Sequence, residues 1–542
     1  MTLTTTIVIV VYIGVLAFLG YLGYIKTKNT QDYYLAGRKA NPIIMALSYG
    51  STFISTSAIV GFGGTAGVFG FSLLWLTFLN IFLGIFIAFV FFGKRTRRIG
   101  LNTQSHTFAE LLGKRYDSKL IRKFVAVVIF LFMPIYAAAV MIGGAKFLEA
   151  GFQNLDYNTA LFIFAAIVAA YVFFGGMKTV MYSDALQGTL MLVGMSILLV
   201  FVYAKLGGVT TAHQKLTDLF NSAATREAVA AQTEKFRAGG FQGWTSMPVF
   251  LSANWLTVVT SIVLGVGIGV LAQPQLAVRF MTVKSDREIS RAVPTGGFFI
   301  LMMTGVAFTV GALTNVFFFE KYGQISAVYA GGADSVIPKF IESFLPGWFF
   351  PIFLIALLSA GMSTMSSQFH TIGTAIGRDL LGKDDMDQKK AMLITRIGMI
   401  IAIVYTIILA YALPKIWSDS IAISTGLFMG LCAAAFLPMY VGALYLKKLT
   451  KTAAVSGMIA GFSTSLLWMM FIHTKESTAM KICKLLFGKV SLAETSKYTQ
   501  FVDPIIIALS ISIIVTIVVQ LIVSKKKQLP KEHIDKCFEG VK

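Results

Sequence analysis

The chain has 542 residues, of which 56% are hydrophobic and 13% charged, and its mean hydropathy is +0.76. Soluble globular domains average about 25% charged residues, so this composition excludes an ordinary soluble protein. The net charge of +21 does not indicate nucleic-acid binding, because the basic residues lie in short loops between apolar runs.

Apolar runs long enough to cross a bilayer recur from end to end. We therefore expect one transmembrane domain over residues 1–542, embedded in a lipid bilayer. The first run, 5–25, has no basic segment before it and is longer than the apolar core of a signal peptide, so we interpret it as a retained span. The thirteen predicted spans are roughly 5–25, 42–66, 70–93, 124–150, 158–176, 184–206, 247–275, 294–318, 347–376, 391–415, 419–445, 452–474 and 502–524.

The basic residues predict the orientation of these spans. An odd number of spans places the two termini on opposite sides of the membrane. With the N-terminus outside, 32 of the 46 lysines and arginines lie on the inner side and 14 on the outer side. Cytoplasmic loops are enriched in lysine and arginine. The sequence thus predicts a plasma-membrane protein with an outside N-terminus and a cytoplasmic tail over 525–542.

Two of the predicted spans contain helix-breaking residues. The second includes "SYGSTFISTSAIVGFGGTAG", and the seventh includes Gly265, Gly267, Gly269 and Pro274. Glycine packing between helices is one explanation. However, the two spans are the first members of two successive groups of five, over 42–206 and 247–445, which are followed by two C-terminal spans over 452–524. Interrupted spans at corresponding positions of two halves are typical of inverted-repeat secondary transporters.

The ninth predicted span carries a stripe of hydroxyl groups in "SAGMSTMSSQ". On a helix, Ser359, Ser363, Ser366 and Ser367 share one face, and Thr364 lies at its edge. Hydroxyl and free carbonyl oxygens are ligands for hard cations. The alternative is that these hydroxyls bond to carbonyls of their own helix.

Asp184 lies at the start of the sixth span. A carboxylate within a membrane costs about 2.5–3.5 kcal/mol on insertion scales, so it indicates a functional site. An ion pair with the nearby Lys178 is the alternative interpretation. We expect no arginine or lysine to be buried within the membrane.

Several motifs occur together in the order in which one family has them: "DYYLAGR", "TFISTSAIVGFGGTAG", "GGAKFLE", "FGGMKTVMYSDALQG", "QPQLAVRFM" and "ALLSAGMSTMSSQ…GRDLL". On these motifs the chain resembles the sodium/solute symporter family, and within it the pantothenate, monocarboxylate and proline branch. The resemblance implies an all-α fold of the leucine-transporter type, with a 5+5 inverted repeat, one extra N-terminal span and about 13 transmembrane helices.

The resemblance also implies a set of site residues, with Na⁺ as the coupling ion. The first sodium site would use the carbonyls of Ser51, Ile54 and Ala360 and the hydroxyls of Ser363 and Thr364. A possible second site, which would allow two sodium ions for each solute, would use Asp184, Ser363, Ser366 and Ser367. The solute is expected at the two interruptions, near Ser55, Thr56, Gly265, Gly267, Gln273 and Gln275.

These residues predict sodium-coupled symport of a small organic solute by alternating access. The apolar Ala58, Ile59 and Val60 argue against a sugar, and a monocarboxylate or a pantothenate-like anion is the expected solute. A proline-type amino acid is the alternative. Gln275 replaces a histidine that is frequent in the family, which weakens any histidine-specific role. A carboxylate would be held by helix N-termini and bound sodium.

Other classes of function lack support in the sequence. A channel would need rings of charge along a pore. An enzyme would need a nucleophile, base or metal set, and the five histidines are scattered along the chain. We therefore expect a transporter with no catalytic residues, whose partners are the solute and sodium ions but no nucleic acid. The sequence leaves the oligomeric state open, and a monomer could suffice.

Overall fold

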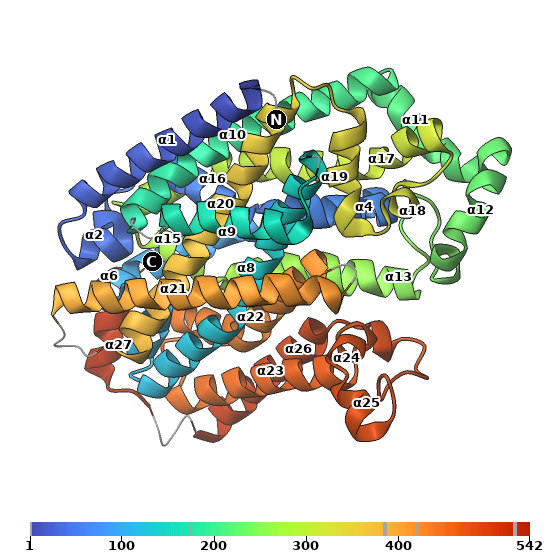
Figure 1. Ribbon diagram of the computed structural model, residues 1–542. Coiled ribbons are helices and arrows are strands. Elements are labelled where there is room, and N and C mark those ends of the chain that lie inside the picture. Colours follow the sequence, from blue (N-terminus) through green and yellow to red (C-terminus); the bar gives the residue numbers. More distant parts are fainter. Residues whose placement is uncertain are drawn as a thin grey trace.

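The structure is a computed structural model that describes residues 3–152, 154–172, 176–382, 387–417, 420–523 and 528–541. Within these ranges the chain folds into helices, and the one pairing of extended segments seen there is an isolated bridge between Ala40 and Val283. Apolar runs are expected to form helices, because a backbone in hydrocarbon must form its hydrogen bonds within its own segment. Figure 1 shows the resulting bundle, in which many of the long helices run in roughly the same direction.

The structure contains 11 helices, among the described residues, that are long and apolar enough to cross a membrane. Two of the thirteen predicted spans do not add to this number. Predicted span 70–93 follows the span before it without a non-helical residue, so the two count as the one helix Ser57–Asn102 although the chain turns at Gly70. Predicted span 158–176 forms a helix of only 16 residues before it leaves the described range. The 11 helices are Thr5–Lys26, Ser57–Asn102, Lys119–Gly151, Met177–Leu206, Ala253–Ala272, Asp286–Tyr322, Phe350–Leu380, Gln388–Lys415, Ser420–Tyr445, Lys451–Phe471 and Pro504–Val523.

Eight membrane segments are regular α-helices over their whole described length. They are α1 (Leu3–Lys26), α8 (Lys119–Gly151), α9 (Tyr157–Val172), α10 (Met177–Leu206), α21 (Gln388–Ala412), α22 (Ser420–Tyr445), α23 (Lys451–Phe471) and α26 (Pro504–Val523).

Five further segments change helix type or break along their length. They are α3 (Pro42–Phe53) with η2 (Ser57–Phe62) and α4 (Gly63–Phe69); α5 (Leu74–Ile81) with η4 (Phe82–Gly93) and α6 (Lys94–Asn102); α13 (Ala253–Leu256) with η5 (Thr257–Val266), α14 (Gly267–Gly269), η6 (Val270–Ala272) and α15 (Pro274–Phe280); α16 (Asp286–Ile300) with η7 (Leu301–Gly305) and α17 (Val306–Tyr322); and α20 (Phe350–Thr374) with η8 (Ala375–Leu380).

Short helices cover the two ends of the bundle. They are α2 (Thr30–Leu35), α7 (Phe108–Arg115), α11 (Val209–Asn221), α12 (Ala223–Ala238), α18 (Ser326–Ala330), α19 (Ala333–Phe344), α24 (Thr474–Met480), α25 (Ile482–Phe487), α27 (Lys531–Cys537) and the 3₁₀ turns η1 (Ala36–Arg38), η3 (Gly70–Leu73), η9 (Leu413–Lys415) and η10 (Thr499–Phe501).

One end of the bundle, here called the α6 face, carries α2, α6, α7, α15 and α27. Arg97 of α6 forms an ion pair with Asp286 at the start of α16, with 2.7 Å between Nη1 and Oδ1. The Asn102 amide donates to the Cys537 carbonyl at 3.0 Å, which ties α27 to the end of α6. In Figure 1, α1 runs from the N mark to α2, on the side of the view where α6, α27 and the C mark also lie.

The opposite end, here called the α12 face, carries α11, α12, α18, α19, α24 and α25. The Gln232 side chain of α12 donates to the Gly323 carbonyl at 2.9 Å and accepts from the Ile325 amide at 2.8 Å. The chain reverses direction on this face between α4 and α5. Gly70 makes the reversal possible, because its φ is 65° and a Cβ atom there would lie 1.8 Å from the Trp244 carbonyl oxygen.

The two interrupted segments have their breaks in the interior of the bundle. α3 begins at Pro42 with Asn41 as its N-cap and ends at Phe53, and the backbone of the next residue, Ile54, is extended. α15 begins at Pro274, directly after Gln273, whose backbone is also extended. Helix α3 packs against α10, α16 and α20, so the first break faces the hydroxyl stripe of α20.

Candidate functional site

The first interruption frees backbone carbonyls inside the protein. In a continuous helix the Ala58 amide would donate to the Ile54 carbonyl. Here the Ala58 amide donates to the Ser55 carbonyl at 3.0 Å, and the Ile59 amide donates to the same oxygen. The Ile54 carbonyl therefore lies outside the helical hydrogen-bond pattern. A break of this kind persists in a membrane protein where the freed groups line a cavity or bind a ligand.

The hydroxyl stripe of α20 lies against this interruption. The Ser363 hydroxyl donates to the Ser51 carbonyl at 2.9 Å, and the Thr364 hydroxyl lies 3.3 Å from the same oxygen. The Ala360 carbonyl is 3.3 Å from the Ser363 hydroxyl. All five hydroxyl residues of the stripe are fully buried. The structure thus brings together four of the five residues that the sequence predicted for the first sodium site, with Ile54 three residues along the chain from Ser51.

The residues of the predicted second site also meet. The Ser366 hydroxyl lies 3.4 Å from Asp184 Oδ1, and the Ser367 hydroxyl lies 3.4 Å from Asp184 Oδ2. Ser363 joins this group through its carbonyl, which accepts from the Ser366 hydroxyl at 3.0 Å. Ser48 of α3, which the sequence analysis did not select, donates to Asp184 Oδ2 at 2.9 Å.

A buried arginine that the sequence analysis did not select occupies the same place, at the end of the second interrupted segment beyond the span Ala253–Ala272. Arg279 and Asp184 both have 0% exposed side chains and form an ion pair with 2.9 Å between Nη2 and Oδ2. Lys178, the partner considered from sequence, lies at the surface and its ammonium group is 3.5 Å from the Lys26 carbonyl. Lys178 was considered because it is close to Asp184 in the sequence, but the partner that the structure shows, Arg279, is 95 residues away along the chain.

Polar groups at the first interruption cluster around a tyrosine that the sequence analysis missed. The hydroxyls of Ser55 and Ser57 are 2.6 Å apart, and Tyr136 of α8 contacts both and lies 3.5 Å from the Phe53 carbonyl. Thr56, by contrast, points away from this cluster and donates to the Val140 carbonyl. Its hydroxyl is therefore used in the packing of the interrupted segment against α8.

The residues predicted on the second interrupted segment have different surroundings. The Gln275 amide donates to Gln273 Oε1 at 2.8 Å, and both side chains are buried. Gln275 Oε1 has no hydrogen-bond partner among the described residues. Gly267 packs against Leu79, since a Cβ atom there would lie 2.9 Å from the Leu79 Cβ. Gly265 faces the Asp503 carboxylate instead.

Gln368 is a second residue that the sequence analysis did not select, although it ends the quoted stripe. Its side chain is fully buried, and neither its amide nitrogen nor its amide oxygen has a hydrogen-bond partner in the described part of the chain. Buried polar groups are normally paired, so an unpaired amide on this helix indicates a ligand contact. The signal in the sequence was its position, four residues after Thr364, which places it on the same helix face.

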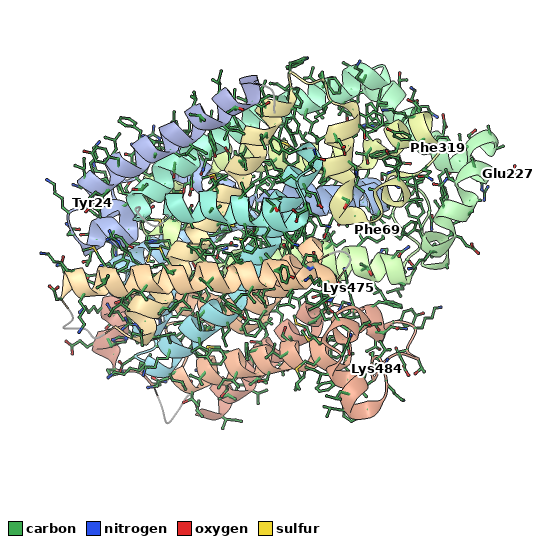
Figure 2. The ribbon with its side chains drawn as sticks, in the orientation of Figure 1. Tyr24, Phe69, Glu227, Phe319, Lys475 and Lys484 are labelled. Atoms are coloured by element: carbon green, nitrogen blue, oxygen red, sulfur yellow. The ribbon has the colours of Figure 1, made fainter. Side chains whose placement is uncertain are left out.

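A cavity of about 590 Å³ opens at the α12 face between the far halves of both interrupted segments. Phe62 and Ile262 line it from the two segments, and its other walls include residues of α12, α22, α24 and the chain before α19. We call it the vestibule. Figure 2 labels two residues of its wall, Phe69 and Lys475. Its charged residues are Lys235, Lys475, Glu476 and Asp503.

The vestibule charges influence one another. Burial raises the pKa of Asp503 to about 6, against an opposing effect of His473. Burial alone would lower the pKa of His473, but the adjacent Glu476 carboxylate outweighs burial and raises it. The Asp503 carboxylate accepts from the Ile505 amide at 3.0 Å, and the Asp503 amide donates to the Thr260 hydroxyl at 3.0 Å. These bonds hold a carboxylate of the C-terminal region against η5.

The chain has relatives among known proteins. The model of the sodium:solute symporter family matches residues 33–461, which is most of the chain. The chain belongs to the sodium:solute symporter family. Two curated relatives of this symporter are the sodium/proline symporter 2 of Staphylococcus saprophyticus, 27% identical over 487 residues, and the sodium/proline symporter of Staphylococcus aureus, 28% identical over 478 residues. The alignments cover 87% and 86% of this chain, and the same shares of the relatives.

A solved structure has the same fold. It is a Na⁺-coupled sialic acid symporter in a substrate-bound outward-open state, with a TM-score of 0.71 and 17% sequence identity, and the match covers 97% of this chain and 98% of that one. The predicted all-α fold of the leucine-transporter type is confirmed. The predictions of a multi-pass membrane protein, of sodium-coupled symport and of Na⁺ as the coupling ion are confirmed by the family.

Proposed function

We propose that this symporter takes up a small solute with one carboxylate group, together with sodium, across the plasma membrane. The observation that carries the proposal is the meeting of the Ser51 carbonyl with the hydroxyls of Ser363 and Thr364 at the first interruption. This contact joins the break in one segment to helix α20 through oxygen atoms alone. Oxygen ligands without a fixed charge suit an alkali cation that must bind and leave in every cycle.

The first sodium site consists of the carbonyls of Ser51, Ile54 and Ala360 and the hydroxyls of Ser363 and Thr364. In the structure the two hydroxyls donate to backbone carbonyls. A hydroxyl hydrogen can rotate, and its oxygen can then face a cation while the carbonyls keep their place. Sodium bound here links α3 to α20, so its arrival favours one arrangement of the interrupted segment over another.

The solute site lies beside the first sodium site. We assign it to Ser55, with Ser57 and Tyr136 as added polar contacts, and to Gln273 and Gln275 across the bundle. The helix formed by η2 and α4 begins at this point, so the positive end of its dipole and the sodium ion can both attract a carboxylate. Gly265 faces the Asp503 carboxylate instead, and Thr56 and Gly267 support the packing of the two segments.

Two classes of solute carry one carboxylate group. The lysines of the vestibule, Lys235 and Lys475, favour the monocarboxylate or pantothenate-like anion that the sequence predicted. The relatives named sodium/proline symporters, together with the carboxylates of Glu476 and Asp503, favour a zwitterionic amino acid. The anion is our first proposal, and the amino acid is the second.

Alternating access would move the segments of repeat 42–206 against those of repeat 247–445 around this site. The excess of basic residues on one side supports the proposal that the α6 face and the tail 525–542 lie in the cytoplasm and the vestibule outside. A single chain holds all the proposed site residues, so a monomer could transport. No residue of the site is assigned a catalytic role.

A ligand-stabilisation assay tests the solute class. Purified protein is heated with a panel of acetate, lactate, pantothenate, proline and glucose, in sodium chloride or choline chloride. A ligand at 100 times its Kd stabilises the folded state by about 2.7 kcal/mol. We expect stabilisation by a carboxylate compound in sodium only. Stabilisation by glucose, or stabilisation that does not need sodium, would contradict the proposal.

Two variants separate an anion from an amino acid. Lys475→Gln should weaken stabilisation by an anion more than stabilisation by a zwitterion, because it removes a positive charge from the vestibule. Asp503→Asn should have the opposite preference. Lys484→Gln is the matched control, because Lys484 is exposed on α25 and does not line the vestibule. If Lys475→Gln and Lys484→Gln weakened stabilisation by an anion equally, the positive charge of the vestibule would not explain the preference for an anion.

A further inference from the structure

The side chain of Arg279 ends in a pocket of oxygen atoms contributed by three helices. Its Nη2 nitrogen donates to Asp184 Oδ2 at 2.9 Å and to the hydroxyls of Thr52 and Ser367. Its Nε nitrogen donates to the Ser48 hydroxyl at 3.0 Å. One carboxylate oxygen and three hydroxyls thus surround a single positively charged group. Hard oxygens with one negative charge are also the donor set of a monovalent cation site.

This pocket shares its ligands with the second sodium site suggested by the sequence. Asp184 and Ser367 belong to both, and the Ser366 hydroxyl touches the other oxygen of the same carboxylate. The Thr52 and Ser367 hydroxyls are only 2.9 Å apart, so the guanidinium nitrogen fills the space between α3, α10 and α20. A sodium ion on the same oxygens would lie in contact with a like charge in a fully buried place, which is strongly unfavourable.

A backbone bond holds Arg279 in this position. Its Nη1 nitrogen donates to the Gln275 carbonyl, one turn earlier on α15. α15 starts at Pro274, where the second interrupted segment resumes its helix. The guanidinium does not lose its proton in proteins. The cation is therefore permanent, and its position depends on the second interrupted segment.

We infer that Arg279 is the built-in cation of the second site, and that this transporter binds one mobile sodium ion in each cycle. This inference rests on the proposed first sodium site. The Arg279 guanidinium holds α15 to α3, α10 and α20 through Asp184, Thr52 and Ser367, as a second sodium ion would do if these oxygens were free. One sodium ion with a monoanion then moves no net charge, and one sodium ion with a zwitterion moves one positive charge.

Sodium-binding stoichiometry tests the inference, with radioactive sodium-22 as the probe and purified full-length protein as the sample. We expect the native protein to bind one sodium ion, and Ser363→Ala to lower the affinity of this binding by about tenfold to a hundredfold. Arg279→Gln should uncover Asp184, Ser366 and Ser367, so the variant should bind two ions and its Hill coefficient should rise from about one toward two. Arg279→Lys keeps a cation and should stay at one ion.

The controls separate the possible outcomes. Arg279→Gln combined with Asp184→Asn should return to one ion, because the uncovered site loses its carboxylate. Arg115→Gln, which removes another fully buried arginine that donates to the Ala443 carbonyl of α22, should leave one ion. Two ions on the native protein, or one ion on a folded Arg279→Gln variant, would overturn the inference. Specific binding with an unchanged affinity in Ser363→Ala that is lost in Asp184→Asn would do the same.

The native protein and Ser363→Ala decide the question even where Arg279→Gln fails to fold. Absence of specific sodium-22 binding to the native protein would count against the proposed first site, and so against the proposed function. Two ions on the native protein would count against the role of Arg279 alone, and would leave sodium coupling intact.

Discussion

Replacing Ser363 by alanine removes one oxygen from the proposed first sodium site while the helix is kept. The Ser363 hydroxyl is fully buried and lies 2.9 Å from the Ser51 carbonyl and 2.8 Å from the Ser359 carbonyl. Its backbone bonds are those of an ordinary α-helix, in which alanine is well tolerated. The substitution therefore changes the ligand set rather than the fold.

The size of the effect follows from the charge of the ligand. A hydrogen-bond-like contact to a charged group contributes about 1.5–3 kcal/mol. Each 1.4 kcal/mol is about a factor of ten in affinity, so the apparent sodium affinity should fall by about tenfold to a hundredfold. Thr364→Ala should have a similar effect, because the Thr364 hydroxyl contacts the carbonyls of Ser51 and Thr52.

The assay is the sodium concentration that gives half-maximal solute uptake into proteoliposomes, supported by sodium-dependent thermal stabilisation of the purified protein. Ser359→Ala is the matched control, since Ser359 belongs to the same stripe but its hydroxyl bonds to Tyr12 at 3.0 Å. We expect Ser359→Ala to keep the native sodium dependence. An unchanged sodium dependence in both Ser363→Ala and Thr364→Ala would refute the site.

Three further predictions concern other parts of the molecule. The native cysteines are all buried, so an impermeant maleimide should label Glu227→Cys in intact cells and Asp535→Cys only after permeabilisation; the reverse pattern would contradict the orientation. Burial raises the pKa of Asp503 to about 6, so the stability that this carboxyl contributes is present near pH 4 and is lost as the pH rises through 6. Asp503→Asn should therefore raise the melting temperature above pH 7 and not near pH 4, and an equal shift at both pH values would contradict this reasoning. Tyr12→Phe removes the bond to Ser359 and should cost about 0.5–1.5 kcal/mol of stability without a change in sodium affinity, and a tenfold loss of sodium affinity would show that α1 acts on the site.

Much of the fold, the break at Ile54 and the hydroxyl face of α20 could be predicted from the sequence, because these features depend on local patterns. Long apolar runs fix the spans, and the extended backbone at Ile54 and Gln273 lies where glycines, hydroxyl residues and Pro274 interrupt those runs. The spacing of Ser363 and Thr364 fixes their helix face. Each of these features involves residues within a few turns of one another.

The role of Arg279 could not be predicted in this way. An arginine near the end of a predicted span was interpreted as an orientation signal, and its burial depends on the packing of α15 against three helices from distant parts of the chain. The same limit explains why Lys178 was considered as the partner of Asp184. Thr56 and Gly267 illustrate a further limit, since a sequence pattern does not show whether a residue at an interruption faces the ligand or a neighbouring helix.

The most direct test of sodium-coupled symport of a carboxylate solute is concentrative uptake into proteoliposomes. The purified protein is reconstituted, and uptake of a radiolabelled carboxylate selected by the stabilisation assay is followed with an inward sodium gradient, with equal sodium on both sides, or with choline in place of sodium. We predict transient accumulation above the outside concentration with the gradient only, and its loss in Ser363→Ala. Accumulation that persists without a sodium gradient, or uptake that never exceeds equilibrium with one, would contradict the account.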